Sequence, residues 1–366
     1  MKIESSKKLG DVLKEYKEKN TDNKYKPVAV GRYGIRKRED IYSKELAKDY
    51  SKNKLIYKDT LTVGMGSKQI DIGILTDAEI YAVSPAYHTF RINNIDANYL
   101  RYCLDARNAD MSERFMIASA RQGKSVDFKK MLEYEIPVYS EIDTQTILYN
   151  LSKIENIILN LDSQLEKMEL LVKSRFIEMF GDSNKTCKLG EVCTKITDGT
   201  HKTPNYLAEG ITFISAKNIV NGELDYSDVK HISEEEYSEI QKRCGTEKND
   251  ILLSKSGSLG QPAIIKTDEK LGLFESLAVI KYDRNKLIPE FLKEQLKSDN
   301  VQWQFSMSEK GVAVKHLHLE VIKNIDIVLP DIGLQKEFAS FVDQIDKSKL
   351  AIYKIKKHVL GRRLAT

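Results

Sequence analysis

The sequence predicts an α+β fold: two similar α/β domains in a pseudo-twofold arrangement, separated by a long antiparallel two-helix coiled coil. Three observations predict it. The chain repeats its own motifs in the same order, two segments carry heptad patterns, and the segments between them mix strand-like and helical runs. A long internal repeat restricts the architecture more than any single motif, because each copy is expected to fold alike. Two copies in one chain also point to a target that comes in two halves.

The repeat is made of short motifs that return after 180 to 193 residues, always in the same order. The matching blocks are Lys8-Leu9-Gly10-Asp11-Val12 with Lys188-Leu189-Gly190-Glu191-Val192, Lys58-Asp59-Thr60-Leu61 with Asn249-Asp250-Ile251-Leu252, Tyr99-Leu100 with Phe291-Leu292, Gly123-Lys124-Ser125-Val126 with Gly311-Val312-Ala313-Val314, and Tyr134-Glu135-Ile136-Pro137 with Ile327-Val328-Leu329-Pro330. We therefore expect one domain over residues 1–142 and a second, related domain over residues 183–333.

Both predicted domains mix strands and helices. Strand-like runs such as Ile211–Ile214 and Leu277–Ile280 are bounded by glycine and charged turns. Short helical runs occur as well, for example Pro289–Lys297, where proline stands near the expected helix start. This mixture predicts an α+β domain with a curved sheet in each half.

Two long helices are predicted, a central one over residues 143–182 and a C-terminal one over residues 334–363. Each has apolar residues at alternating spacings of four and three, which is the a/d pattern of a coiled coil. Amphipathic helices lying on their own domains are the alternative, but such helices do not need a strict 3.5-residue period. The expected seam residues are Ile147, Leu151, Ile154, Ile158, Leu161, Leu165 and Met168, and Leu334, Phe338, Phe341, Ile345, Ile352 and Ile355.

The bulk composition is that of an ordinary globular protein. The 366 residues are 41% hydrophobic and 31% charged, with a net charge of +4, so nucleic-acid binding would need local basic patches. The four cysteines form no C-x-x-C pair, which disfavours a zinc ribbon or redox motif. No signal-peptide pattern and no run of 18 apolar residues occurs. We expect a cytoplasmic protein without a membrane span.

The ordered motifs resemble those of a known family. They are K-L-G-[DE]-V at each domain start, the Asp198-Gly199-Thr200-His201 motif, the block at Asn249–Lys255, and a strand that ends in Leu329-Pro330 before a heptad helix. Together they resemble the specificity (S) subunits of Type I restriction-modification systems. The resemblance implies two target recognition domains, each reading one half of a split DNA site. It also implies two methyltransferase subunits as partners, restriction (helicase-nuclease) subunits as further partners, and S-adenosylmethionine bound in the methyltransferase subunits.

Basic and polar clusters in both halves are candidates for DNA contacts, because arginine pairs with guanine edges and lysine with phosphates. A solvated charge run is the alternative for any single arginine, and a tight turn is the alternative for Gly123 and Gly311. The candidates in the first half are Arg32, Tyr33, Arg36, Lys37, Arg38, Lys68, Gln69, Arg121 and Lys124. Those in the second half are Thr200, His201, Lys202, Thr203, Lys255, Ser256, Gln261, Lys310, Lys315 and His316.

The sequence carries no motif that predicts catalysis. It has no Walker sequence, no G-x-G-x-x-G loop and no nucleophile elbow. Ser84-Pro85-Ala86-Tyr87 lacks the second proline of the adenine-methyltransferase tetrad. His316 and His318 have no acidic or thiol partner at metal-ligand spacing. We expect a non-catalytic subunit with no cofactor or metal of its own.

Two other functions remain open at this level. The chain is a coiled-coil scaffold for proteins if its basic clusters serve only solubility. It is the recognition subunit of a related two-chain restriction enzyme if its partners differ from those of a Type I system. DNA selectivity separates the first alternative from the DNA-reading hypothesis.

Overall fold

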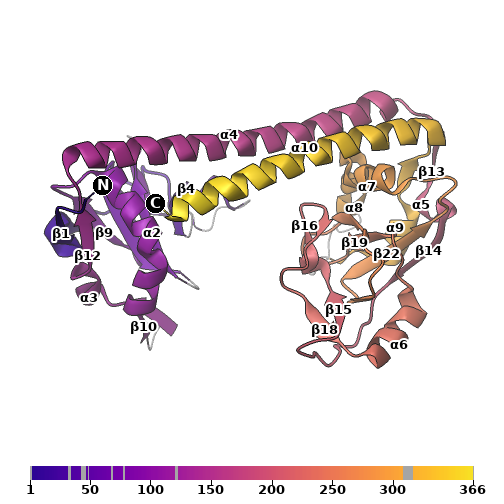
Figure 1. Ribbon diagram of the computed structural model, residues 1–366, viewed down its shortest axis with the longest axis horizontal. Coiled ribbons are helices and arrows are strands. Elements are labelled where there is room, and N and C mark those ends of the chain that lie inside the picture. Colours follow the sequence, from indigo (N-terminus) through magenta and orange to yellow (C-terminus); the bar gives the residue numbers. More distant parts are fainter. Residues whose placement is uncertain are drawn as a thin grey trace. The chain divides into compact units, whose positions relative to one another are not determined.

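The computed structural model describes residues 2–31, 34–42, 47, 49–66, 69–76, 79–119, 123–307 and 316–365. The chain forms two compact units, the first of residues 1–159 and 358–366 and the second of residues 160–357. Each unit contains a four-stranded antiparallel sheet with helices packed beside it (Figure 1). Two long helices, α4 (Glu141–Phe180) and α10 (Ile332–Ala365), follow the two domains in the chain.

The sheet of the first unit has the strand order β2-β9-β6-β7, and each neighbouring pair is antiparallel. Helix α2 (Ala97–Phe115) packs against β7, and apolar residues of both elements share one buried core. The chain enters through β1 and α1 and leaves through β12, which pairs with β1. The bounds are β1 Ser5–Lys8, α1 Leu9–Val12, β2 Leu13–Tyr16, β6 Thr60–Met65, β7 Ile70–Leu75, β9 His88–Ile92 and β12 Glu135–Val138.

Smaller elements of the first unit surround this sheet. The hairpin β3–β4 packs on β7, where Ile35 lies over Gly73. Apolar residues of β3, β7 and the pair β5–β8 form a second, smaller buried core in this unit. A further hairpin, β10–β11, lies beside β6. The bounds are β3 Val28–Gly31, β4 Gly34–Lys37, η1 Arg38–Asp40, β5 Lys54–Ile56, β8 Tyr81–Val83, β10 Met116–Ser119, β11 Gly123–Val126 and α3 Phe128–Leu132.

The sheet of the second unit has the strand order β14-β22-β19-β20, again antiparallel throughout. A three-stranded sheet, β18-β15-β21, has its own core with helix α6. The bounds are β13 Thr186–Lys188, α5 Leu189–Val192, β14 Cys193–Asp198, β15 Ile211–Ile214, η2 Ala216–Asn218, β16 Ile219–Val220, β17 Glu223–Leu224, β18 Lys230–Ile232, α6 Glu234–Cys244, β19 Ile251–Ser254, β20 Pro262–Ile264, β21 Leu271–Leu273, β22 Leu277–Tyr282, α7 Pro289–Lys297, α8 Asp299–Met307, α9 Leu319–Asn324 and β23 Asp326–Val328.

The two domains share one topology, which confirms the predicted repeat. The order β2-β9-β6-β7 corresponds strand by strand to β14-β22-β19-β20, and the pair β1–β12 corresponds to β13–β23. The repeated K-L-G-[DE]-V motif makes the same turn twice, because the acidic side chain accepts the backbone N–H of Lys8 in one copy and of Lys188 in the other. At Gly10 and Gly190 a Cβ would lie 3.2 Å from a backbone oxygen, so both copies favour glycine there.

A second repeated motif forms the turn before β6 in the first sheet and before β19 in the second. Asp59 and Asn249 both have a positive φ, and each donates its N–H over 2.8 Å across the sheet, to Leu75 and Ile265. The following side chain, Thr60 or Asp250, accepts the N–H of the residue three positions earlier. The motif is therefore structural in both halves.

Each unit binds its own stretch of α4. In the first unit, Arg101 on α2 makes two hydrogen bonds of 2.9 and 3.0 Å to the carboxylate of Glu155 on α4, and the hydroxyl of Tyr102 donates to the same group. In the second unit, Glu169 on α4 accepts from Lys349, and Lys173 pairs with Asp299 at 2.7 Å. The helix predicted over residues 143–182 is observed as α4.

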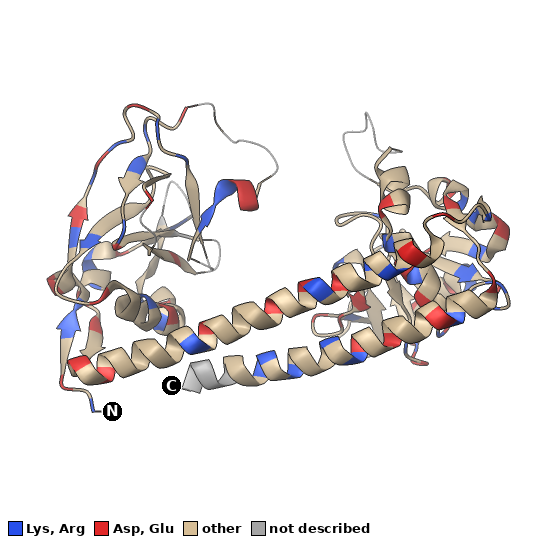
Figure 2. Cartoon of the chain, turned by 90° about the horizontal axis from the view of Figure 1, so that it is seen from above, with Lys and Arg blue, Asp and Glu red and all other residues tan. Residues whose placement is uncertain are grey.

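Within the second unit, α4 and α10 pair antiparallel. Three ion pairs show the antiparallel direction: Arg175–Glu337, Glu169–Lys349 and Asp162–Lys356. The residue numbers on α4 decrease from pair to pair while those on α10 increase. Acidic and basic residues are interspersed along both helices (Figure 2). Buried residues of the pair include Leu161, Val172, Phe180, Phe338, Val342 and Ile352. The predicted coiled coil is confirmed.

The predicted seam of α10 is wrong at two positions. Leu334 is 45% exposed and Ile355 is 50% exposed. The inward positions instead include Lys349 and Lys356, whose side chains are only 13% and 26% exposed. Charged residues are accommodated there because Glu169 and Asp162 on α4 supply a carboxylate to each. The other predicted seam residues, Ile147, Leu151, Ile154, Ile158, Leu165, Met168, Phe341 and Ile345, are partly buried.

No helix in the part of the chain that the structure describes combines the length and the apolar character needed to cross a membrane. Among the same residues, histidine, cysteine and acidic side chains do not gather in threes as a metal ion would require. The four cysteines are free thiols, and Cys103 and Cys244 are buried.

Candidate nucleic-acid interface

One edge of the second unit's sheet gathers the loops that the sequence singled out. Strands β14 and β19 end at this edge, and β22 and β20 begin there, because Asp198 pairs with Ala278 and Ser254 with Leu277. The loop after β14 and the loop after β19 are therefore neighbours although some 50 residues separate them in the sequence. Antiparallel pairing brings the predicted polar loops of this half together.

The loop after β14 leaves the sheet through a tight passage. A Cβ at Gly199 would lie 2.1 Å from the carbonyl oxygen of Leu273, which is backbone and cannot move aside. Thr200 donates its N–H to Leu273 O over 2.9 Å and accepts the N–H of Glu275 over 2.9 Å. Beyond this fixed base the side chains of His201, Lys202 and Thr203 are exposed. The loop thus has a rigid base and a polar, accessible tip.

A buried carboxylate lies beneath the same loop. Asp198 is only 5% exposed in its side chain, yet three basic groups surround it: Lys255, Arg243 and, with a Nε2–Oδ2 distance of 3.3 Å, His201. Arg243 also donates through Nε to the main-chain oxygen of Asp198 over 3.2 Å. Burial alone would raise the pKa of Asp198, but the hydrogen bonds and charges of Lys255 and Arg243 outweigh it and hold the pKa below its usual value.

Lys255 does not serve the role that the sequence predicted. Its side chain is 3% exposed and its ammonium group binds Asp198, so it does not reach a DNA phosphate. The reason is that a lysine at the end of a buried strand needs a carboxylate partner, which β14 supplies from across the sheet. The prediction of Lys255 as a DNA contact is therefore wrong.

The glycine-rich loop after β19 is closed on itself. Ser254 accepts the N–H of Gln261 through Oγ over 2.9 Å and donates its own N–H to Gln261 O over 3.0 Å. Gly257 has a φ of +72° and open space around it, so it lies at the exposed tip. Ser256 and Gln261 are partly buried. Gln302 on α8 donates to Gly260 O over 2.8 Å and ties the loop to that helix.

His316 also lies at this edge. The next residue, Leu317, donates its N–H to Lys255 O over 2.9 Å. The ring of His316 stacks edge-on with that of His318 and lies 3.9 Å from the carboxylate of Glu275. Burial and the nearby charge of Lys255 lower the pKa of His316. The predicted contacts Lys310 and Lys315 lie outside the described residues.

In the first unit the corresponding edge lies where β2 and β6 end and β9 and β7 begin. Gln69, a predicted contact, is partly buried in the β6–β7 turn, and its carbonyl oxygen accepts the N–H of Gly66 over 3.0 Å. Lys124 is exposed on β11, which packs beside β6. These two candidates thus come from elements next to the end of the sheet.

The basic cluster of the first half lies on a separate strand. Arg36 and Lys37 are exposed on β4, and the guanidinium of Arg38 lies 5.4 Å from the ring centre of Tyr42. The strand packs on β7, so this cluster borders the sheet of the same unit. The remaining candidates of this half, Arg32, Tyr33, Lys68 and Arg121, lie outside the described residues.

Comparisons with known proteins show which family this chain is similar to. Residues 182–360 match the Type I restriction modification DNA specificity domain. Over 157 residues the chain is 32% identical to the EcoBI specificity subunit of Escherichia coli, a stretch that is 43% of this chain and 33% of that subunit. Residues 182–360 are thus similar to the Type I specificity family. The chain matches about a third of the length of this curated relative.

Solved structures share the fold of the whole chain. The S subunit of a Type I restriction-modification system from M. genitalium has a TM-score of 0.50 at 16% identity, covering 98% of this chain and 93% of that one. A chain from a structure of a Type I system described for complex assembly and conformational transition has a TM-score of 0.52 at 14% identity, covering 100% and 97%. The two-domain fold with long helices is thus that of specificity subunits.

The second domain contains polar residues that the sequence analysis did not identify. Asp198 entered the predictions only as part of a motif, and Arg243 on α6 and Glu275 before β22 did not enter them. A signal for Asp198 was present, since an aspartate directly before a glycine often anchors a turn. No pattern in the sequence places Arg243 beside Asp198, because the contact joins residues 45 positions apart.

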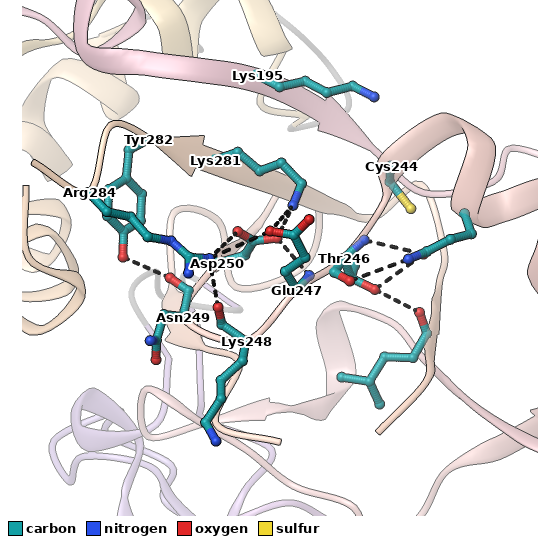
Figure 3. A network of polar contacts seen from close by, with 12 residues as sticks. Lys195, Cys244, Thr246, Glu247, Lys248, Asn249, Asp250, Lys281, Tyr282 and Arg284 are labelled. Atoms are coloured by element: carbon teal, nitrogen blue, oxygen red, sulfur yellow. Dashed lines mark hydrogen bonds and ion pairs between the residues drawn. The ribbon is translucent and has the colours of Figure 1, made fainter. Parts of the chain in front are cut away.

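The opposite end of the same sheet in the second domain holds a second buried aspartate. Asp250 is 3% exposed in its side chain, accepts from Lys281 over 2.7 Å and from Glu247 N over 2.8 Å, and has Arg284 nearby (Figure 3). Tyr282 donates its hydroxyl to Asn249 O over 2.7 Å beside it. This network closes the turn before β19, at the end of the sheet away from the loop after β14.

Proposed function

We propose that this chain is the non-catalytic specificity subunit of a Type I restriction-modification complex and recognises a bipartite double-stranded DNA target. The observation that carries the proposal is the duplicated sheet, with the exposed polar loop of His201, Lys202 and Thr203 at one edge of the second sheet. DNA reading needs cations for phosphates and hydrogen-bonding side chains for base edges. The loop of His201, Lys202 and Thr203 offers both kinds of group, and so do the exposed cations of β4.

The expected partners follow from the likeness to the Type I specificity family. Two methyltransferase subunits would bind S-adenosylmethionine and methylate adenine, and helicase-nuclease subunits would cleave DNA in a complete system. The chain's own residues would bind and orient the DNA. The support for this division is that the chain matches a DNA specificity domain and resembles a specificity subunit.

A binding experiment tests the proposal. The chain is assembled with its methyltransferase subunits and titrated against a library of duplexes at several salt concentrations. We expect selection of one bipartite sequence, with an affinity that falls steeply as salt rises, because phosphate contacts release counterions. Equal binding to all sequences, or no binding, would remove DNA reading and leave the protein scaffold as the better hypothesis.

A further inference from the structure

The buried Asp198 joins three separate parts of the second domain. Its carboxylate binds Lys255 from the end of β19, Arg243 from the last turn of α6, and His201 from the loop that follows β14. Because the side chain of Asp198 is only 5% exposed, it is not available to a ligand at the surface, whereas that of His201 is 55% exposed. The carboxylate therefore acts on the surface only through its neighbours.

The backbone of the loop after β14 is also held in place by contacts. Gly199 fits against Leu273 only without a Cβ, and Thr200 makes two hydrogen bonds of 2.9 Å to the turn before β22. Lys202 donates its N–H to Thr200 Oγ1 over 3.2 Å, which continues the turn. These contacts fix where the loop starts, and the contact with Asp198 orients the imidazole ring of His201.

We infer that Asp198 is the positioning residue for base reading by the second domain. It holds the exposed imidazole of His201 in one geometry at the base edges of one half-site. This inference rests on the proposed function. Base discrimination requires hydrogen-bonding groups placed to within about 0.5 Å, whereas phosphate contacts tolerate a looser loop. Loss of Asp198 therefore reduces sequence discrimination more than it reduces overall DNA affinity.

The test uses the complete complex with its methyltransferase subunits. The wild-type target is first selected from a duplex library, and binding is then measured to duplexes altered in one half-site or the other. With Asp198→Asn, we expect the preference for the correct base pairs to fall by about tenfold or more in one half-site. The preference in the other half-site stays at the wild-type level.

A matched control variant distinguishes a loss of loop positioning from a loss of domain stability. Asp250 is equally buried, is paired with a lysine, and lies at the opposite end of the same sheet. Asp250→Asn therefore loses a comparable buried interaction without touching the loop, and it keeps wild-type discrimination. If Asp250→Asn relaxes the same half-site as strongly, discrimination follows the stability of the domain and the inference is overturned.

A double variant covers the case in which Asp198→Asn does not fold. Asp198→Asn with Lys255→Met removes both members of the buried ion pair and keeps their volumes, so no unpaired buried charge remains. This variant is expected to fold and still to lose discrimination in one half-site. Wild-type discrimination in a folded double variant overturns the inference. A wild-type complex without any sequence preference instead overturns the proposed function itself, so the two failures are distinguishable.

Discussion

Gly199 shows how a single residue decides whether the polar loop of the second domain can form. A Cβ there would lie 2.1 Å from Leu273 O and 2.6 Å from Phe274 O, and neither backbone atom can rotate away. Gly199→Ala is therefore expected to lower the free energy of unfolding by about 1–3 kcal/mol. Urea denaturation followed by circular dichroism measures the change.

Gly333 supplies the control for that substitution. It lies in the first turn of α10, and a Cβ added there would have nothing within 4 Å. Gly333→Ala therefore changes stability by at most about 1 kcal/mol and in the favourable direction. Equal effects of the two substitutions would mean that the close approach at Gly199 carries no strain.

The lowered pKa of Asp198 leads us to expect that the stability of the protein depends on pH. Its pKa in the folded protein is lowered by Lys255 and Arg243 despite burial, so the ionised form is favoured by folding. The resulting stability is fully present above the ordinary value of 3.8 and is lost as the pH falls through the lowered pKa. The difference in unfolding free energy between wild type and Asp198→Asn is expected to narrow below pH 3.8. Urea titrations at about pH 7, 4 and 3 measure it, and a constant difference would contradict the assignment.

At the scale of elements, the pairing of α4 with α10 includes two lysines at inward positions. Lys349 is 13% exposed and binds Glu169, which also lies 3.4 Å from Lys297. In Lys349→Met the carboxylate of Glu169 still contacts solvent and Lys297, so the substitution leaves no buried charge without a partner. Replacing an ion pair by a packed apolar side chain is often neutral or stabilising by about 1–4 kcal/mol. We expect unchanged or higher stability in thermal unfolding.

A lysine on the outer face of α10 serves as the comparison for Lys349. Lys347 is 74% exposed and pairs with Asp343 one turn earlier, and Lys347→Met should leave the melting temperature nearly unchanged, because exposed pairs contribute little. A clear loss of stability in Lys349→Met alone would show that the pair with Glu169 is a net stabilising interaction.

At the scale of the whole molecule, the two domains are expected to contribute separately to DNA binding. Lys37 on β4 and Lys202 in the second domain are both exposed. Each of Lys37→Ala and Lys202→Ala is expected to reduce the slope of log affinity against log salt by about 0.9, the value for one phosphate contact. Because the two lysines belong to different units, the effects add in the double variant.

Lys248 provides the control for these slopes. It is exposed beside the Asp250 network, where it pairs with Asp268, at the sheet edge opposite the polar loop. All three variants are compared in gel-shift titrations at several salt concentrations, and Lys248→Ala should leave the salt dependence unchanged. An equal change in all three variants would indicate a general effect of net charge and not local DNA contacts.

The predictions from sequence succeeded where the signal was local or repeated and failed where it depended on a distant partner. The turns at Lys8–Val12 and Lys188–Val192 are the same because their residues make all the essential contacts nearby. The heptad pattern predicts Ile355 as an inward residue of α10, because an apolar residue fits the pattern better than the neighbouring Lys356. Only the carboxylate of Asp162, far away in the sequence, makes Lys356 the inward residue.

The sequence by itself determined that the chain contains two related domains and two heptad helices, and that it resembles the specificity family, since motif order and periodicity are properties of the chain alone. The tertiary structure decided which charged residues are exposed. Lys255 and Lys202 look alike as residues of polar loops, but Lys255 is buried against Asp198 and Lys202 is not. The physical reason is that burying a charge requires a partner of opposite sign, and strand pairing across the sheet determines where that partner lies.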